Sequence, residues 1–260
     1  MIRRIQDERF NLMEYIGDEY YKCLYLYLDY KQYGVNDNNV EVYVQEENGN
    51  IVAACLKYSS SLHIYSRELN CNYDELYSFI KENNYRAIFA EAQIIHKLEN
   101  KSNNEYKSEY GNVWQVGNIS DGDVSEVELA NITDFEEIAK LIMTDEDIAS
   151  SYDYDDLVKQ LRDRYKDKFG RNYVMRYEDQ IVSHICTNAE TDNAAIVALL
   201  IVDAKYRRMG IATKMLRKIA RDLSIEGKNA YLINYTENST ALYEKMGMKK
   251  CCEWGKLIRI

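Results

Sequence analysis

The sequence predicts an α/β protein with a mixed central sheet flanked by helices, preceded by an N-terminal α/β lobe. Two observations predict this class. In the second half, apolar stretches typical of strands alternate with stretches whose apolar residues recur at the helical period. In addition, Ala194–Val202 runs for nine residues without a charge, as expected for a strand buried on both faces.

The first half predicts a smaller lobe of helices and a hairpin. Apolar residues fall on one helical face over residues 8–30, and Asn72 with Glu75 behind it predicts a capped helix. Residues 85–95 fit either a strand or a buried helix. The predicted hairpin consists of residues 40–46, the turn Asn48-Gly49-Asn50 and residues 51–58.

The second half predicts a regular succession of elements. A capping box at Thr133 and Glu136 predicts the start of its first helix. Gly210 begins the helix that follows the uncharged strand. The predicted elements are a strand at 127–130, a helix from 133, a helix at 153–168, strands at 173–177, 181–187 and 194–202, a helix at 210–223, a strand at 230–235, a helix at 239–245, and a strand pair at 248–254 and 256–260.

Length and composition permit two domains. The chain has 260 residues, of which 46% are hydrophobic and 29% charged, which is typical of a globular protein. Residues 99–123 are polar and predict a connection. We therefore expect an N-terminal α/β lobe over residues 1–120 and a second domain over residues 126–260.

Charge and residue usage exclude several classes of partner. The net charge of −10 disfavours binding to nucleic acid or to an anionic membrane. No apolar run is long enough to span a bilayer, and the first residues do not resemble a secretory signal. The six cysteines form no CxxC pair and the three histidines share no ligand spacing. We expect reduced thiols, a cytoplasmic location and no metal.

The segment from Val202 to Thr213 predicts an anion site. The uncharged strand ends, a turn with Arg207 and Arg208 follows, and a helix begins at Gly210. The first amides of a helix have no internal partner and lie at the positive end of its dipole. We expect them to bind phosphate, in particular a pyrophosphate. The alternative is a tight strand-to-helix turn with solvated arginines. Walker and GxGxxG loops are absent.

Two motifs carry a family resemblance. Arg207, Gly210 and Ala212 fill the pattern Q/R-x-x-G-x-G/A, which resembles the acyl-CoA signature of the GCN5-related N-acetyltransferases (GNAT). Downstream, residues 241–248 (ALYEKMGM) are similar to the family's L-Y-x-K-x-G-F, with Met248 in place of the aromatic residue. The resemblance covers residues 126–260 and implies the acyl-CoA N-acyltransferase fold. Residues 1–120 resemble a degenerate partner half in element order only.

The resemblance implies a site for acetyl-CoA as co-substrate, with no metal. The backbone of the buried strand would bind the pantetheine arm, and the amides of the turn and helix start would bind the pyrophosphate. Asn238 lies near the place of a family asparagine, which Thr236 occupies here, although Asn238 could instead cap the last helix. The implied cofactor-binding residues are Leu200, Ile201, Val202, Arg207, Arg208, Met209, Gly210, Ile211, Ala212, Thr213 and Asn238.

The resemblance also implies catalytic residues. Tyr243 matches the general acid, which would protonate the departing thiolate; the alternative is that it only packs the helix. The glutamate that many members use as base is replaced by Ile196. Glu190 is the candidate base, with Asp192 and His184 as alternatives, and each could instead be a surface or hairpin residue.

The function implied is acetyl transfer from acetyl-CoA to an amine of a small molecule or peptide by direct attack. The alternative is a non-catalytic acyl-CoA-binding or sensing module whose N-terminal lobe binds a partner. The residues carry no signal that names the acceptor or the oligomeric state.

Overall fold

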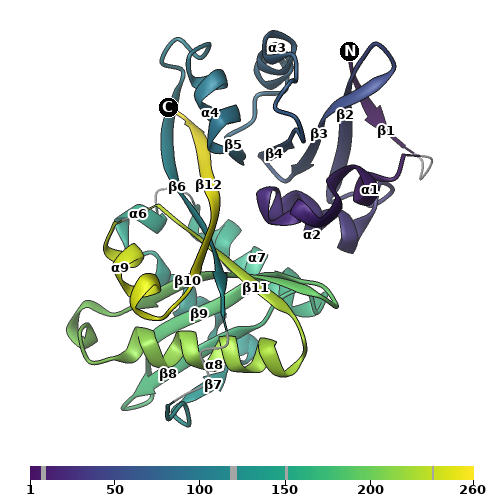
Figure 1. Cartoon of the computed structure of the whole chain (residues 1–260). Helices are drawn as coiled ribbons and strands as arrows, with labels where there is room; N and C mark the ends of the chain where they lie inside the picture. The colour runs from purple at the N-terminus through teal and green to yellow at the C-terminus, as the bar shows by residue number, and fades with distance from the viewer. Residues whose placement is uncertain (7–9, 118–121, 150–151, 236) are drawn as a thin grey trace. The chain divides into compact units, whose positions relative to one another are not determined.

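The computed structural model describes residues 1–6, 10–117, 122–149, 152–235 and 237–260 (Figure 1). The chain divides into two compact units. Unit 1 consists of Met1–Trp114, Ile233–Leu242 and Lys250–Ile260. Unit 2 consists of Gln115–Leu232 and Tyr243–Lys249. The C-terminal residues thus belong to the same compact unit as the N-terminal half.

Unit 1 contains a sheet in the order β1-β2-β3-β4-β5-β12-β6. β4 and β5 run parallel, whereas the pairs β1/β2, β2/β3, β3/β4 and β5/β12 are antiparallel. The elements are β1 (Ile2–Ile5), α1 (Leu12–Ile16), the 3₁₀ helix η1 (Gly17–Lys22), α2 (Leu24–Tyr33), β2 (Val40–Glu47), β3 (Asn50–Tyr58), β4 (Ser61–Tyr65), α3 (Tyr73–Asn83), β5 (Ala87–Glu91), α4 (Ala92–Glu99), β6 (Tyr106–Val116) and β12 (Lys249–Arg259).

Several details of unit 1 differ from the sequence prediction. The predicted helix over residues 8–30 is broken into α1, η1 and α2, because Gly17 ends α1 with φ 64°. Residues 85–95 form both a strand and a helix, β5 followed by α4. β6 occupies part of the polar segment predicted as a connection. The predicted hairpin and the Asn72 cap are confirmed, since Asn72 Oδ1 accepts a hydrogen bond from the Glu75 amide at 3.1 Å.

Unit 2 contains a mixed sheet in the order β11-β10-β9-β8-β7. β10 and β11 are parallel, and the other neighbours are antiparallel. The elements are β7 (Val127–Leu129), η2 (Ile132–Asp134), α5 (Phe135–Ile142), α6 (Glu146–Ala149), α7 (Tyr154–Lys166), β8 (Asn172–Tyr177), β9 (Gln180–Glu190), β10 (Ala194–Val202), η3 (Ala204–Tyr206), α8 (Ile211–Ile225) and β11 (Asn229–Asn234). Helix α9 (Glu237–Lys245) is divided: its residues up to Leu242 belong to unit 1 and those from Tyr243 to unit 2.

Helices cover the sheet of unit 2. α5 and α7 form a buried apolar cluster with β8, β9 and β10, which includes Phe135, Ile138 and Ile201. α8 crosses β7 to β10 (Figure 1) and buries Met215 and Ile219. The mixed sheet flanked by helices is therefore confirmed. In the described ranges, no helix is both long enough and apolar enough to cross a bilayer.

The capping box predicted at Thr133 and Glu136 is wrong. Asn131 and Asp134 form the box instead: the Asn131 amide donates to Asp134 Oδ2 at 2.8 Å, and the Asn131 side chain accepts from the Asp134 amide. The 3₁₀ turn η2 thus precedes α5, and the chain enters the helical region two residues earlier than the Ser/Thr pattern indicates.

Both halves of the chain repeat one order of main elements. Leaving aside the short helices η1, η2, α6 and η3, residues 1–116 run β-α-α-β-β-β-α-β-α-β, and residues 127–259 repeat that order. In each half the fourth and fifth strands are parallel. The element order therefore agrees with a second, GNAT-like lobe in the first half.

Candidate functional site

In unit 2 the two parallel strands separate part of the way along. Their pairing runs from Ala194 opposite Asn229 to Val197 opposite Leu232. β10 continues beyond this point to Val202. Residues 198–202 therefore lie outside the paired register with β11, which leaves backbone donors and acceptors on that edge of β10 for another partner.

β10 is also irregular on its other side. Its pairing with β9 goes from Ala198 opposite Cys186 directly to Ile201 opposite His184, so β10 holds an extra residue there. Leu199 has φ 51°, the left-handed region that a leucine seldom adopts. The bulge re-aims the backbone of β10 within the segment that no longer pairs with β11.

The turn after β10 is built by its own side chains. Asp203 Oδ1 accepts from the Lys205 amide at 2.8 Å, which starts the 3₁₀ turn η3. Arg207 Nε donates to the carbonyl oxygen of Val202 at 3.1 Å, and its guanidinium lies 3.8 Å from Asp145. Arg207 thus closes the turn as well as supplying charge. Arg208 is exposed and has φ 66°.

The start of α8 is open to a ligand. Gly210 is its N-cap with φ 81°, and an added Cβ there would meet no atom within 4 Å. No side chain caps this helix, and no acidic residue lies in its first turn. The amides that follow Gly210 keep their hydrogen-bonding capacity, and Arg208 adds positive charge. The donor set is that of an anion site and fits a pyrophosphate.

The corresponding helix of the first half has the opposite character. α3 is capped by the Asn72 side chain, and Asp74 and Glu75 occupy its first turn. A cap satisfies the amides that an anion would use, and two carboxylates repel it. The anion-binding geometry therefore belongs to α8 and not to α3.

Tyr243 lies in α9 and is 7% exposed. Its carbonyl oxygen accepts from the amides of Met246 at 3.1 Å and Met248 at 3.0 Å, and Gly247 turns the chain with φ 72°. These bonds end α9 and hold the residue in place. The role of Tyr243 as general acid stays a prediction.

Glu190 is part of a buried ion cluster. Its carboxylate accepts two hydrogen bonds from Arg171 (2.6 and 2.5 Å), one from Lys228 Nζ (2.7 Å) and one from Thr187 Oγ1 (2.5 Å). Burial raises the pKa of Glu190, but the hydrogen bonds from Arg171 and Lys228 outweigh it and lower the pKa overall. A carboxylate held by four donors is a poor proton acceptor.

The position of Glu190 on the sheet also argues against a role as general base. Glu190 lies opposite Ala195, at the end of β10 that is farther from Val202. Arg171 and Lys228 also bind Glu226, which lies directly after α8. These contacts favour a structural role for Glu190 over the predicted role as base.

The remaining predicted residues fall in different surroundings. Ile201 is 3% exposed and packs in the core of unit 2, whereas Leu200, Val202, Ala212 and Thr213 are partly exposed. Met209 is 65% exposed. Asp192 is exposed in the turn between β9 and β10. Thr236 and the side chain of Asn238 lie outside the described residues.

His184 is 0% exposed and lies within β9, so it is not the surface or hairpin residue that the sequence offered as an alternative to a base. Its Nδ1 lies 3.0 Å from the carbonyl oxygen of Leu199, and its Nε2 lies 2.9 Å from Asn172 Oδ1. Burial lowers the pKa of His184 to about 4. The ring is therefore neutral at pH 7 and bonded at both nitrogens.

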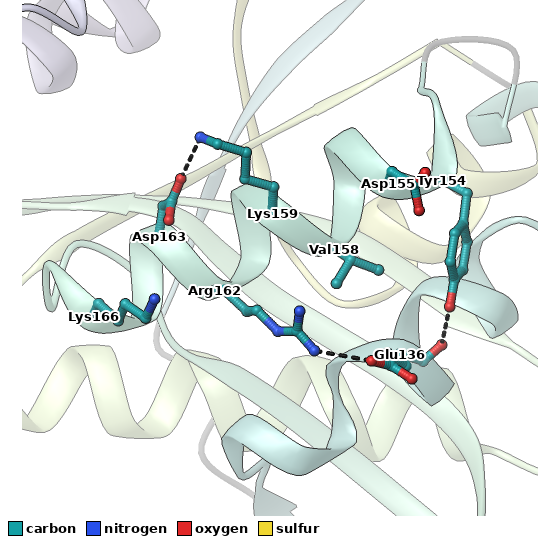
Figure 2. A pocket seen from close by; sticks show the side chains of 8 residues that line it. All are labelled: Glu136, Tyr154, Asp155, Val158, Lys159, Arg162, Asp163 and Lys166. Carbon is teal, nitrogen blue, oxygen red and sulfur yellow. Dashed lines mark hydrogen bonds and ion pairs between the residues drawn. The ribbon is translucent and has the colours of Figure 1, made fainter.

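A surface pocket of about 530 Å³ lies elsewhere in unit 2, on α5 and α7. Its charges neutralise one another: Arg162 binds Glu136 at 3.0 Å, and Lys159 binds Asp163 at 2.6 Å (Figure 2). It shares no residue with the anion site. Among the described residues, no group of three or more His, Cys, Asp or Glu side chains could hold a metal ion.

The comparisons with known proteins give the class of the fold. A Drosophila protein solved by X-ray crystallography is 13% identical, with a TM-score of 0.66 over 100% of this chain and 98% of that chain. A GNAT-family acetyltransferase from Colwellia psychrerythraea is 13% identical, with a TM-score of 0.59 over 100% of both chains. A tandem GNAT protein from the clavulanic acid biosynthesis pathway is 8% identical, with a TM-score of 0.53 over 84% of this chain and 82% of that chain.

These similarities show the acyl-CoA N-acyltransferase fold. The model of the acetyltransferase (GNAT) family matches residues 134–248. The matched residues contain the β10 bulge, the turn and the start of α8. No curated protein matches the chain.

The bulge at Leu199 and the side chains that bond to it were not predicted from the sequence. The segment Ala198–Val202 reads as an unbroken strand, with no glycine or proline to mark an irregularity. The only signal was the polar pair Ser183 and His184 inside an otherwise apolar strand, since buried polar side chains need partners.

Proposed function

We propose that the protein is an N-acetyltransferase that uses acetyl-CoA as co-substrate and transfers the acetyl group to an amine of a small molecule or peptide. One observation carries the proposal. The start of α8 is uncapped, and Gly210 there is open to solvent. One turn earlier in the chain, the last residues of β10 are not paired with β11. An elongated ligand with a pyrophosphate at one end and amide groups along its arm fits both features.

Each part of this site has a distinct task. The amides from Arg208 to Thr213 bind the pyrophosphate, and the backbone of Leu200 to Val202 bonds the pantetheine arm as an added strand would. Arg207 holds the turn through Val202. The helix start and the arginines supply the positive field that the phosphates need, so the site requires no metal.

Acetyl transfer by direct attack needs two proton movements. The amine must be neutral when it attacks the thioester carbonyl, and the thiolate that leaves must be stabilised or protonated. Tyr243 supplies the second proton; a thiol has a pKa of roughly 8.5, so a phenol within hydrogen-bond reach is a suitable donor. The first proton passes to water, because Ile196 cannot accept it and Glu190 is held by Arg171 and Lys228.

The acidic balance of the chain supports a cationic acceptor such as a polyamine or a lysine side chain. The cysteine usage supports a cytoplasmic location. The first half, whose α3 start is capped and acidic, is proposed as a degenerate lobe that binds no second coenzyme.

The experiment follows free thiol release from acetyl-CoA with a panel of amines, in buffer that contains a chelator. We expect release above the hydrolysis background with at least one amine, and a roughly ten- to thousandfold slower release in Tyr243→Phe. Binding of acetyl-CoA without release for any amine would instead support the alternative, an acyl-CoA-sensing module. Absence of binding would refute both.

A further inference from the structure

Two side chains of β9 bond directly to the irregular backbone of β10. Ser183 Oγ donates to the carbonyl oxygen of Ile201 at 2.7 Å. His184 Nδ1 lies 3.0 Å from the carbonyl oxygen of Leu199. Ser183 and His184 are both 0% exposed. These side chains replace the regular ladder where the extra residue interrupts it.

The protonation of His184 follows from its partners. A carbonyl oxygen can only accept a hydrogen bond. The proton of the neutral ring is therefore on Nδ1, which donates a hydrogen bond to the carbonyl oxygen of Leu199. Nε2 then has no proton and can only accept a hydrogen bond. Asn172 Oδ1 lies 2.9 Å from it, and a half-turn of that side-chain amide places the NH₂ group there as the donor. Asn172 is 5% and His184 0% exposed, so the hydrogen bond between these two side chains is shielded from water.

The bulge needs such support. A leucine at φ 51° is in a strained backbone conformation, which persists only where its surroundings fix it. Leu199 is also partly exposed, in the stretch of β10 that β11 leaves unpaired. A backbone that must bond a ligand along this edge depends on its exact shape for the direction of each N–H and C=O.

We propose that Ser183 and His184 are positioning residues that hold the Leu199 bulge in the shape that binds the pantetheine arm of acyl-CoA. The proposal rests on the proposed function of this site. If so, Ser183 and His184 affect binding of the pantetheine arm and not of the phosphates, because the phosphates bind at the start of α8.

Calorimetric titration with two ligands separates these contributions. Acetyl-CoA has the arm, whereas 3′-phospho-ADP is coenzyme A without it. The variants are His184→Phe, which removes both ring bonds, His184→Gln, which restores a donor, and Ser183→Ala, which removes one hydroxyl. Tyr173→Phe is the matched control: Tyr173 lies on the neighbouring strand β8, but its hydroxyl donates to Asp222 Oδ2 of α8 at 2.7 Å and not to the bulge.

We expect Ser183→Ala to weaken acetyl-CoA binding about threefold to tenfold, which corresponds to the loss of one hydrogen bond. His184→Phe removes both ring bonds and should weaken it about tenfold or more. Affinity for 3′-phospho-ADP should change by less than about twofold, and His184→Gln and Tyr173→Phe should bind both ligands like the wild type. If His184→Phe does not fold, Ser183→Ala carries the test.

Two results would overturn the proposal. One is unchanged acetyl-CoA affinity in Ser183→Ala and in folded His184→Phe. The other is an equal loss for both ligands, which would indicate a general structural effect. In either case a wild-type protein that binds both ligands leaves the proposed function intact. A wild-type protein that binds neither refutes the proposed function and this inference with it.

Discussion

Both carboxylate oxygens of Glu190 accept hydrogen bonds from the guanidinium of Arg171, at 2.6 and 2.5 Å. This bidentate pair joins the end of β9 to the residue that precedes β8, and Lys228 extends it to the start of β11. An ion pair that is buried and fully hydrogen-bonded stabilises local structure but has little proton affinity to offer. We therefore expect Glu190 to have a structural role.

Glu190→Gln therefore tests structure against catalysis. We expect the free energy of unfolding to fall by about 2 kcal/mol, because Arg171 and Lys228 lose a buried partner, while kcat stays near the wild-type value. Denaturant unfolding and the thiol-release assay measure the two quantities. Glu226→Gln, which changes a more exposed partner of the same cations, should cost less than about 1 kcal/mol. A stable Glu190→Gln variant with a large loss of kcat would restore the role as base.

The second prediction concerns Tyr243. Tyr243→Phe keeps the ring and its packing but removes the proton, so kcat should fall by roughly ten- to a thousandfold while acetyl-CoA affinity changes little. Steady-state kinetics with an amine identified in the panel, together with a binding titration, measure both. Tyr173→Phe should leave kcat unchanged. An unchanged kcat in Tyr243→Phe, where chemistry limits the rate, would make Tyr243 a packing residue.

The third prediction concerns pH and His184. Its pKa is about 4 in the folded protein because of burial, whereas a free histidine has a pKa near 6.5. Between these values the unfolded chain binds a proton that the folded chain does not. Stability should thus be complete above about pH 6.5 and decline toward pH 4, by about 3 kcal/mol for this group.

Unfolding curves of the wild type and of His184→Gln at a series of pH values isolate this contribution, since the carboxylates titrate in both proteins. The difference in unfolding free energy between the wild type and His184→Gln should vary between about pH 4 and pH 6.5 and become constant above about pH 6.5. A difference that is constant from pH 4 to pH 7 would show that His184 does not titrate as its burial requires.

Hydrophobic patterning predicted many of the elements. β10 was predicted because it is a run of nine residues without a charge, and the hairpin β2/β3 because two apolar stretches flank the turn Asn48-Gly49-Asn50. The long final strand was read as a pair because Gly255 interrupts it. In the structure Gly255 stays within β12, where a Cβ would come 3.0 Å from the Ile95 side chain. The glycine serves close packing there and not a turn.

The site itself was only partly predictable. The motif around Gly210 has a local cause, a helix start that needs no partner from elsewhere, so sequence alone indicates it. The surroundings of Glu190 and His184 depend on neighbours distant in the sequence, Arg171, Lys228 and Leu199. Spacing along the chain carries no information about such contacts.

Titration with acetyl-CoA in the presence of a chelator, on Gly210→Asp and Gly210→Asn, tests whether the start of α8 binds the pyrophosphate. The two side chains have the same size, and both tolerate φ 81° about equally, so they differ in charge alone. We expect one acetyl-CoA to bind per wild-type chain, Gly210→Asn to bind within about tenfold of that affinity, and Gly210→Asp to bind at least about a hundredfold more weakly than Gly210→Asn. Equal affinities of the two variants would show that no anion binds at the start of α8 and would contradict the account.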